Sequence, residues 1–207
     1  MLSPNSMRSL TALATLTAAS ALLNDLSAQN STTRGFNFGF ALEGAGLTVE
    51  GGDQANGGGA GLRIGYGMNR IVTFFVGADG TAFNVEDPDA PNGDWTMAHV
   101  DLGARFHFAN ALRSWVPYLE GAFTARAVRL NDAMIGGNNV GDLSFNGGAF
   151  TVGGGLSVYF SQTFALDLEL MGSGGDFTSI TVDAGTINIP DIQATSGRFR
   201  IGLLWWK

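Results

Sequence analysis

The sequence lacks cysteine altogether and contains almost no lysine. The absence of cysteine excludes disulfide frameworks, thiolate zinc sites and cysteine nucleophiles. Lys207 is the single lysine among 11 basic residues, and charged residues make up 14% of the 207-residue chain, against about 25% in typical soluble domains. Water-facing surfaces normally carry many lysines, so this composition argues against a large solvated exterior. The net charge of -7 and the lack of basic clusters argue against nucleic acid as a partner.

The chain also lacks an apolar run of the length that a membrane-spanning helix needs, about 18 residues or more. Its uncharged stretch Leu10–Leu23 follows the basic Arg8 and precedes small residues that end at Ala28 and Gln29. This order is typical of a secretory signal, although a buried amphipathic helix is the alternative. We therefore predict a cleaved signal at residues 1–29 and one folded domain at residues 30–207. The composition is membrane-like, yet no helix explains it.

From Gly35 onward, apolar residues recur at every second position, which is the period of a half-buried strand. The pattern is clearest at residues 98–108, where even positions are mostly apolar and odd positions are polar or small. Eight such segments are predicted, at residues 36–43, 62–68, 72–79, 98–108, 117–126, 151–160, 164–171 and 198–205. An even number of strands without helices between them favours an antiparallel up-and-down barrel.

The connections between these segments alternate in length. Residues 69–70, 110–114 and 161–162 are short links, whereas 51–58, 86–94, 131–142 and 174–194 are long and rich in Gly, Asn and Asp. Bacterial outer-membrane barrels have short periplasmic turns and longer external loops. The last link holds two β-rich stretches, 178–182 and 186–189, on either side of a turn-like tripeptide. It predicts a hairpin that extends the last two strands, either as an edge for a surface partner or as a purely structural extension.

Alternation alone fits a soluble lipocalin-like barrel or its inverse in a membrane. The polar face mixes charges with many glycines and alanines, as a narrow interior requires. It carries six acids and five arginines, and such a near-balanced set suits a buried ion network. The polar face is therefore predicted to line the lumen. The predicted lumen network comprises Glu43, Arg63, Asp79, His99, Asp101, Arg105, His107, Glu120, Arg126, Asp167, Glu169, Arg198 and Arg200.

Aromatic residues gather at the strand ends next to the short links, where an interfacial girdle is expected. The predicted girdle comprises Tyr66, Phe108, Trp115, Phe160, Phe164 and Trp205. A sparser belt of Trp95, Phe145 and Phe177 is expected at the opposite interface.

The signal, the eight alternating strands and the terminal segment Phe199–Lys207 resemble the small bacterial outer-membrane β-barrels of the OmpA/OmpX-like superfamily. The resemblance covers about residues 35–207. It implies an all-β, eight-stranded antiparallel transmembrane barrel in the outer membrane, monomeric and in contact with lipid and lipopolysaccharide. It also implies recognition of the last strand by the barrel-assembly machinery. The residues that match this assembly signal are Phe199, Ile201, Leu203, Trp205 and Trp206.

Two features of the sequence invite comparison with known catalytic and metal-binding patterns, and neither matches. His99 and His107 beside Asp101 suggest a His–Asp pair or a metal site, but a barrel-type lipid A acylhydrolase uses a His-x-Ser pair, which this sequence lacks. The acidic segment 86–94 has calcium-like donors but misses the EF-hand register. We predict no catalytic, cofactor or metal site. The preferred function is a plugged barrel with a structural or surface-interaction role, and the alternatives are a narrow pore and a lipid-modifying enzyme.

Overall fold

The computed structural model describes residues 33–52, 54–84, 92–108, 114–135, 138–139, 141–182 and 185–207. The predicted signal and most of the acidic segment 86–94 lie outside these residues. The strands are β1 (Gly35–Val49), β2 (Ala55–Gly67), β3 (Val72–Asn84), β4 (Asn92–His107), β5 (Trp115–Ile135), β6 (Asn138–Asn139), β7 (Leu143–Tyr159), β8 (Phe164–Val182) and β9 (Gly185–Trp206).

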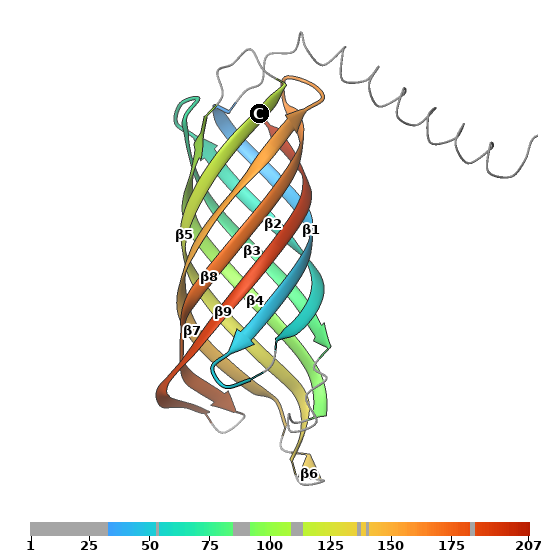
Figure 1. Cartoon of the computed structure of the whole chain (residues 1–207), viewed down its shortest axis with the longest axis vertical. Coiled ribbons are helices and arrows are strands. Elements are labelled where there is room, and N and C mark those ends of the chain that lie inside the picture. Colours follow the sequence, from blue (N-terminus) through green and yellow to red (C-terminus); the bar gives the residue numbers. More distant parts are fainter. Residues whose placement is uncertain are drawn as a thin grey trace, which may run out of the picture.

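Eight long strands form one closed antiparallel ring (Figure 1). Its order is β4-β3-β2-β1-β9-β8-β7-β5, and β5 pairs back with β4 to close it. The two-residue β6 pairs only with the end of β5. The predicted eight-stranded up-and-down barrel is therefore confirmed. Within the described residues, no helix is long and apolar enough to cross a membrane.

The alternating sequence separates the two faces of the wall. Along β9, exposed and buried residues alternate without interruption from Ala194 to Trp206, and the exposed set is largely apolar on the half nearer the C-terminus. Inward-facing glycines make room for long side chains inside. A Cβ on Gly61 would overlap the Arg200 guanidinium, and one on Gly155 would overlap the Tyr118 ring. The glycine content of the polar face thus lets a narrow barrel hold large polar side chains.

The strands run further than the alternation predicted. β2 begins at Ala55, although the sequence predicted a loop as far as Gly58. A Cβ on Gly57 or Gly59 would overlap carbonyl oxygens of β3, so these glycines permit close strand packing. The predicted long link 51–58 is therefore wrong over its second half, because glycine is typical of loops but here permits close pairing of two strands.

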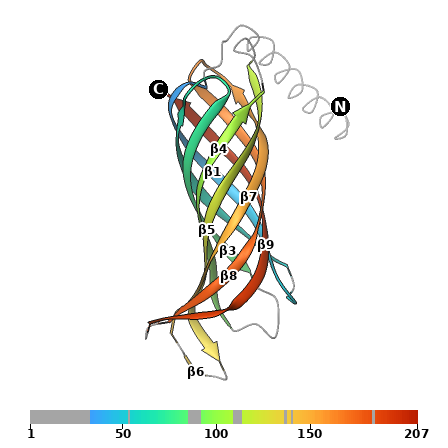
Figure 2. The same cartoon turned by 90° about the vertical axis from the view of Figure 1, so that its left-hand side faces the viewer.

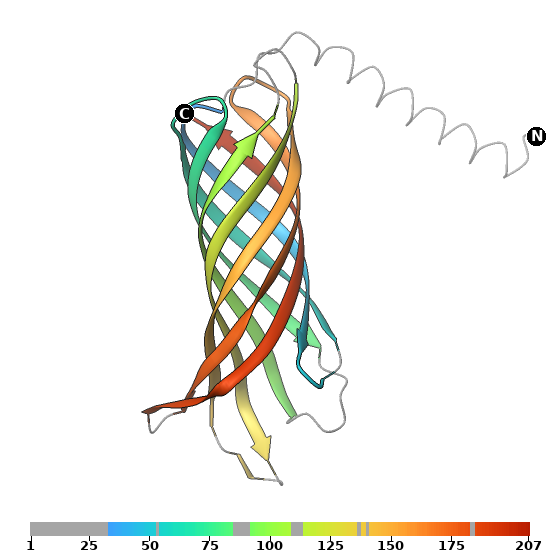
Figure 3. The same cartoon turned by 60° about the vertical axis from the view of Figure 1, so that its left-hand side comes forward.

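The predicted hairpin in the last link is confirmed. β8 and β9 stay paired as far as Val182 and Gly185, with a register shift between Phe177 and Ser179. Figures 2 and 3 show the end of this hairpin swinging out from the barrel wall, at the end opposite to the C-terminus. Most of the predicted 174–194 loop is thus strand.

Candidate functional site in the barrel lumen

The thirteen residues predicted to line the lumen all lie on the inner face of the wall. All are buried except Asp167, whose side chain is 13% exposed. Most of them belong to two groups of ion pairs that are stacked along the barrel axis. Because the groups draw on β2, β3, β4, β5, β8 and β9, they hold opposite walls of the ring together.

The first group, the Glu120 cluster, contains Arg63, Arg105, Glu120, Asp167 and Glu169. Arg63 forms a bidentate pair with Glu120 at 3.0 and 3.1 Å and donates to Glu169 at 3.0 Å. Arg105 donates to Glu120 at 3.0 Å, to Glu169 at 3.1 Å and to Asp167 at 3.1 Å. Two arginines thereby satisfy three carboxylates, as the planar guanidinium allows.

Aromatic rings support these arginines from the side. The Arg105 guanidinium carbon lies 3.6 Å from the centre of the Tyr118 ring, and that of Arg63 lies 4.1 Å from the centre of the Phe75 ring. The Tyr118 hydroxyl also donates to Asp167 at 3.0 Å. These cation–π contacts strengthen where water is excluded, so the rings fix the geometry of the ion pairs.

The second group, the Arg198 cluster, contains Asp79, His99, Asp101 and Arg198. Arg198 Nη1 donates to Asp79 at 2.6 Å and to Asp101 at 3.0 Å. His99 Nδ1 lies 2.9 Å from the other oxygen of Asp79, and the Thr124 hydroxyl donates to Asp101 at 2.6 Å. Every carboxylate here has at least two polar partners.

Arg200 lies between the two clusters. Its Nε is 3.4 Å from Glu43, its Nη1 is 3.6 Å from Glu169, and Glu43 accepts a 2.6 Å hydrogen bond from Thr81. Arg200 thus extends the Glu120 cluster to Glu43 of β1. Removing one member of a buried pair leaves an uncompensated charge, which typically destabilises a fold by about 3–5 kcal/mol.

Two predicted residues lie apart from the ion pairs. His107 is 3.1 Å from the Thr73 hydroxyl, through its Nε2. Arg126 donates to two backbone carbonyls at 3.2 Å, and its guanidinium carbon lies 4.5 Å from the centre of the Phe177 ring. Arg126 is buried without a hydrogen bond to any carboxylate among the described residues. It is a lumen residue, but not a member of the ion-paired network.

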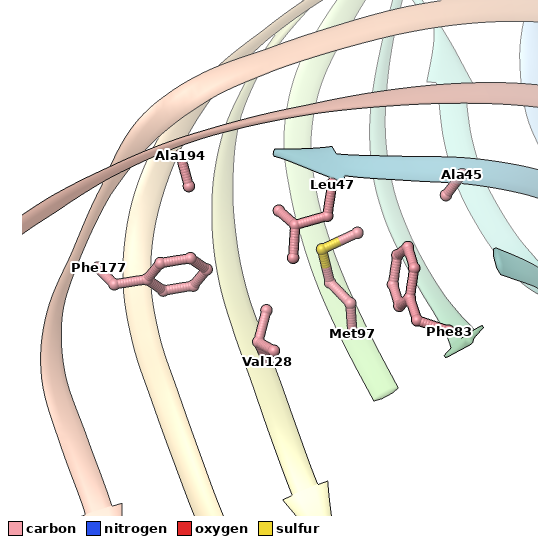
Figure 4. Packing of buried hydrophobic residues seen from close by; sticks show 7 residues of the cluster. All are labelled: Ala45, Leu47, Phe83, Met97, Val128, Phe177 and Ala194. Atoms are coloured by element: carbon pink, nitrogen blue, oxygen red, sulfur yellow. The ribbon is translucent and has the colours of Figure 1, made fainter. Parts of the chain in front are cut away.

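An apolar layer closes the lumen on the side of the β8–β9 hairpin (Figure 4). Its buried members are Ala45, Leu47, Phe83, Met97, Val128, Phe177 and Ala194. Partly buried Trp95 and Phe145 pack against them. The predicted outer belt of Trp95, Phe145 and Phe177 is therefore wrong: these residues belong to an internal cap. Counting positions from the charged residues along each strand, which places Phe83 inward with Asp79, would have revealed it.

A second apolar group lies at the other end, formed by Val116, Tyr159, Ala165, Leu204 and Trp206. Between the two caps, a void of about 20 Å³ beside Arg63 and Arg200 has room for about one water molecule. The lumen is thus filled in three layers, apolar, ionic and apolar.

The same geometry bears on catalysis and metal binding. The side chains of His99 and Asp79 are fully buried in the ionic layer, so a substrate has no access to this pair. Within the part of the chain that the structure describes, no three His, Cys, Asp or Glu side chains are grouped as metal ligands. The carboxylates of the two clusters are occupied by arginine, histidine, tyrosine and threonine side chains, whereas His99 Nε2 and His107 Nδ1 are buried without a hydrogen-bond partner among the described residues.

The six predicted girdle aromatics are all exposed, by 40% to 63%, on the outer wall. Trp205 stacks on Phe38 with ring centres 5.8 Å apart, and Tyr66 contacts Phe36 edge-on at 5.0 Å. Of the residues matched to an assembly signal, Phe199, Ile201, Leu203 and Trp205 share this outer face. Trp206 does not: it is buried in the lumen beside His107, with ring centres 6.3 Å apart. The alternating outward face therefore ends at Trp205.

The family model of the outer membrane protein beta-barrel domain matches residues 10–195. The chain belongs to this family. It is an integral protein of the bacterial outer membrane. Bacterial outer-membrane barrels have short turns on the periplasmic side. The short links of this chain lie at the same end of the ring as the C-terminus, so that end is periplasmic and the β8–β9 hairpin is extracellular. Lipid and lipopolysaccharide surround the wall.

Solved structures share the fold of this outer membrane protein beta-barrel domain. Neisserial surface protein A is 18% identical, with a TM-score of 0.61 and coverage of 83% of this chain and 97% of that chain. OprG from Pseudomonas aeruginosa is 12% identical, with a TM-score of 0.56 and coverage of 87% and 98%. Ail, the attachment invasion locus protein of Yersinia pestis, is 15% identical, with a TM-score of 0.53 and coverage of 84% and 100%. No curated protein sequence matches the chain.

Proposed function

We propose that the protein is a closed outer-membrane barrel with a structural and surface-interaction role, and neither a pore nor an enzyme. The observation that carries this proposal is the three-layered filling of the lumen. A solute would have to separate ion pairs such as Arg198–Asp79 and displace apolar side chains such as Met97, which is 1% exposed. Both changes cost several kcal/mol, so passage through the resting barrel is disfavoured.

The test is single-channel recording with the purified mature protein in planar bilayers. Wild-type protein is expected to give no stable conductance steps. Electrophoresis of unheated and boiled samples recovered from the same vesicles checks that the barrel is folded. Reproducible steps from the folded protein would establish the pore instead. Lipid A that changes in mass when the protein is expressed would establish the enzyme.

The surface role rests on the extracellular edge of β9. β1 pairs with β9 only as far as Val49, opposite Ala194, whereas β9 continues outward to Gly185 with β8 on its other side. Residues 185–192 therefore present an edge without a neighbouring strand among the described residues, and Ile187 on it is 61% exposed. Exposed edges of this kind accept an added strand. Pro190 limits the pairing to the outer part of the edge.

Adhesion of bacteria that express the protein to an epithelial monolayer tests this role. Wild-type cells are expected to adhere above vector controls, and Ile187→Asp is expected to remove the difference by placing a charge on the edge. Ser179→Asp is the matched control, because it adds the same charge to β8 at a residue that pairs with Asn146 of β7 and Asn188 of β9. No adhesion by wild-type cells would reject the surface role and leave the structural one.

A further inference from the structure

Arg129 occupies an unusual position on the outer wall. It is exposed, in register with Thr96 of β4 and Ser144 of β7, near the extracellular end of β5. Neighbouring arginines such as Arg126 and Arg198 point into the lumen. Among the described residues of the extracellular half, Arg129 is the one basic side chain on the outer wall. Its charge therefore faces the surroundings of the barrel.

The depth of Arg129 matches the lipid head-group layer. It lies fourteen residues beyond the girdle residue Trp115 along β5. At about 3.3 Å per residue and a strand tilt of about 40°, this separation is about 35 Å along the barrel axis. The hydrocarbon core of a bilayer is about 30 Å thick, and about 40–45 Å with the head groups. An arginine at that level avoids the cost of the bilayer centre and meets anionic groups.

A pocket of about 340 Å³ adjoins Arg129 on the side of β3 and β4. Its lining is otherwise uncharged and comprises Gly80, Thr81, Ala82, Thr96, Met97 and Ala98. A second pocket of about 340 Å³ on the side of β7 and β8 contains the carboxylate of Asp142. A phosphate group is repelled by a carboxylate, so the first pocket is the favourable one for an anion. There the guanidinium and the Thr96 hydroxyl are the donors that phosphate prefers.

Below this pocket, the outer wall carries a path of small side chains. Gly80, Ala98 and Ala127 form one cross-strand row, and the next row is Ala78, Val100 and Ala125, with small residues on either side of Val100. The path leads to an apolar groove of about 470 Å³ at mid-membrane. The side chains that rim this groove are those of Phe74, Leu102, Phe106, Phe123 and Phe150. Its floor includes Gly121, eight residues or about 20 Å in depth from Arg129. An extended acyl chain fits such a path.

We propose that this wall binds one lipid A molecule of lipopolysaccharide. A phosphate of its head group lies on Arg129 and Thr96, and one acyl chain follows the small-residue path into the groove rimmed by Phe123 and Phe150. Charge selects this occupant, because the outer leaflet that surrounds Arg129 presents phosphorylated lipid A. The inference goes beyond the proposed function, and it stands whether or not the lumen conducts or the β9 edge binds a partner.

Binding is measured by native mass spectrometry of the folded mature protein in zwitterionic micelles, titrated with bisphosphorylated lipid A. Arg129→Gln removes the charge, and Gly80→Leu fills the path. A Cβ on Gly80 meets no atom within 4 Å, so this substitution is compatible with the fold. Gly44→Leu on β1 is the matched control, because Gly44 also lies on the outer wall with open space at its Cβ.

Wild type and Gly44→Leu are expected to retain one lipid A with equal affinity. Arg129→Gln is expected to weaken retention about tenfold, the loss of one charge-assisted contact. Gly80→Leu is expected to weaken retention because its side chain blocks the path of the acyl chain. Dephosphorylated lipid A is expected to bind weakly and to be insensitive to Arg129→Gln. Equal losses in Gly44→Leu, or no effect of Arg129→Gln, would show an unspecific lipid shell. Phosphatidylglycerol retained as tightly through Arg129 would overturn the assignment to lipid A.

Discussion

The buried arginines of the lumen differ in whether their charge is paired with carboxylates. Arg198 bridges Asp79 and Asp101, so its charge compensates two carboxylates that are themselves inaccessible to water. Arg126 is just as buried but donates only to backbone carbonyls and stacks on Phe177. The first arginine neutralises its surroundings, whereas the second carries its own desolvation cost.

Methionine at these two positions separates the roles. Arg198→Met is expected to lower the free energy of unfolding by about 3–5 kcal/mol, because it leaves Asp79 and Asp101 without their cation. Arg126→Met keeps the length and removes a buried charge that hydrogen-bonds only to backbone carbonyls, so its effect is expected to be within about 1 kcal/mol of zero or stabilising. Urea unfolding in lipid vesicles, followed by tryptophan fluorescence, measures both. Equal losses would mean that packing, and not charge compensation, dominates.

Within the strands, glycines on the inner and outer faces of the wall differ in whether their neighbours leave room for a side chain. Gly59 of β2 lies where a Cβ would overlap the carbonyl of Gly80 on β3. Gly44 of β1 faces outward into open space. One glycine is required by the approach of two backbones, and the other is not required by any neighbour in the described structure.

Alanine at both positions tests this distinction. Gly59→Ala is expected to destabilise the barrel by about 1–3 kcal/mol, because β2 and β3 must separate to admit the methyl group. Gly44→Ala is expected to be neutral or to stabilise by up to about 1 kcal/mol, through the lower entropy of the unfolded chain. The folded fraction across a urea series, read by electrophoresis without boiling, compares them. A loss at Gly44 as large as at Gly59 would contradict the argument.

Strand periodicity also explains what could be predicted from the sequence. The alternation at residues 98–108 assigns each side chain to a face, so it predicts that His99 and Arg105 point into the lumen. The alternation does not predict which side chains form ion pairs. Arg198 pairs with Asp79 only because the ring closes and brings together residues that are 119 positions apart. Residue type alone gave a wrong prediction for Phe177. An aromatic residue is typical of an interfacial belt, but the position of Phe177 on β8 places its side chain in the internal cap.

The whole molecule is closed by layers with different chemistry, and each layer protects the next. The caps exclude water from the ion pairs, and a lower local dielectric strengthens every attraction between them. The ion pairs in turn remove the need for an apolar filling in the middle of the barrel. Damage to one layer should therefore cost stability before it opens a passage.

Met97→Ala tests this redundancy. Met97 is buried in the extracellular cap, and its truncation is expected to cost about 2–5 kcal/mol. Conductance is nevertheless expected to stay absent, because the Arg198 cluster still fills the barrel beneath. Bilayer recording and urea unfolding on the same preparation supply the two readouts. A conducting variant with unchanged stability would show that the cap alone closes the lumen.

Strand β9 carries two of the five lumen arginines, Arg198 and Arg200, whose carboxylate partners lie on β1, β3, β4 and β8. Until β9 docks, those carboxylates face one another without these counter-charges. Contacts between distant parts of a chain form slowly, because the chain loses the entropy of loop closure before the contacts contribute any stabilising energy. Ring closure therefore also neutralises charge, and a chain interrupted before β9 lacks the arginines that pair with Asp79, Asp101 and Glu43.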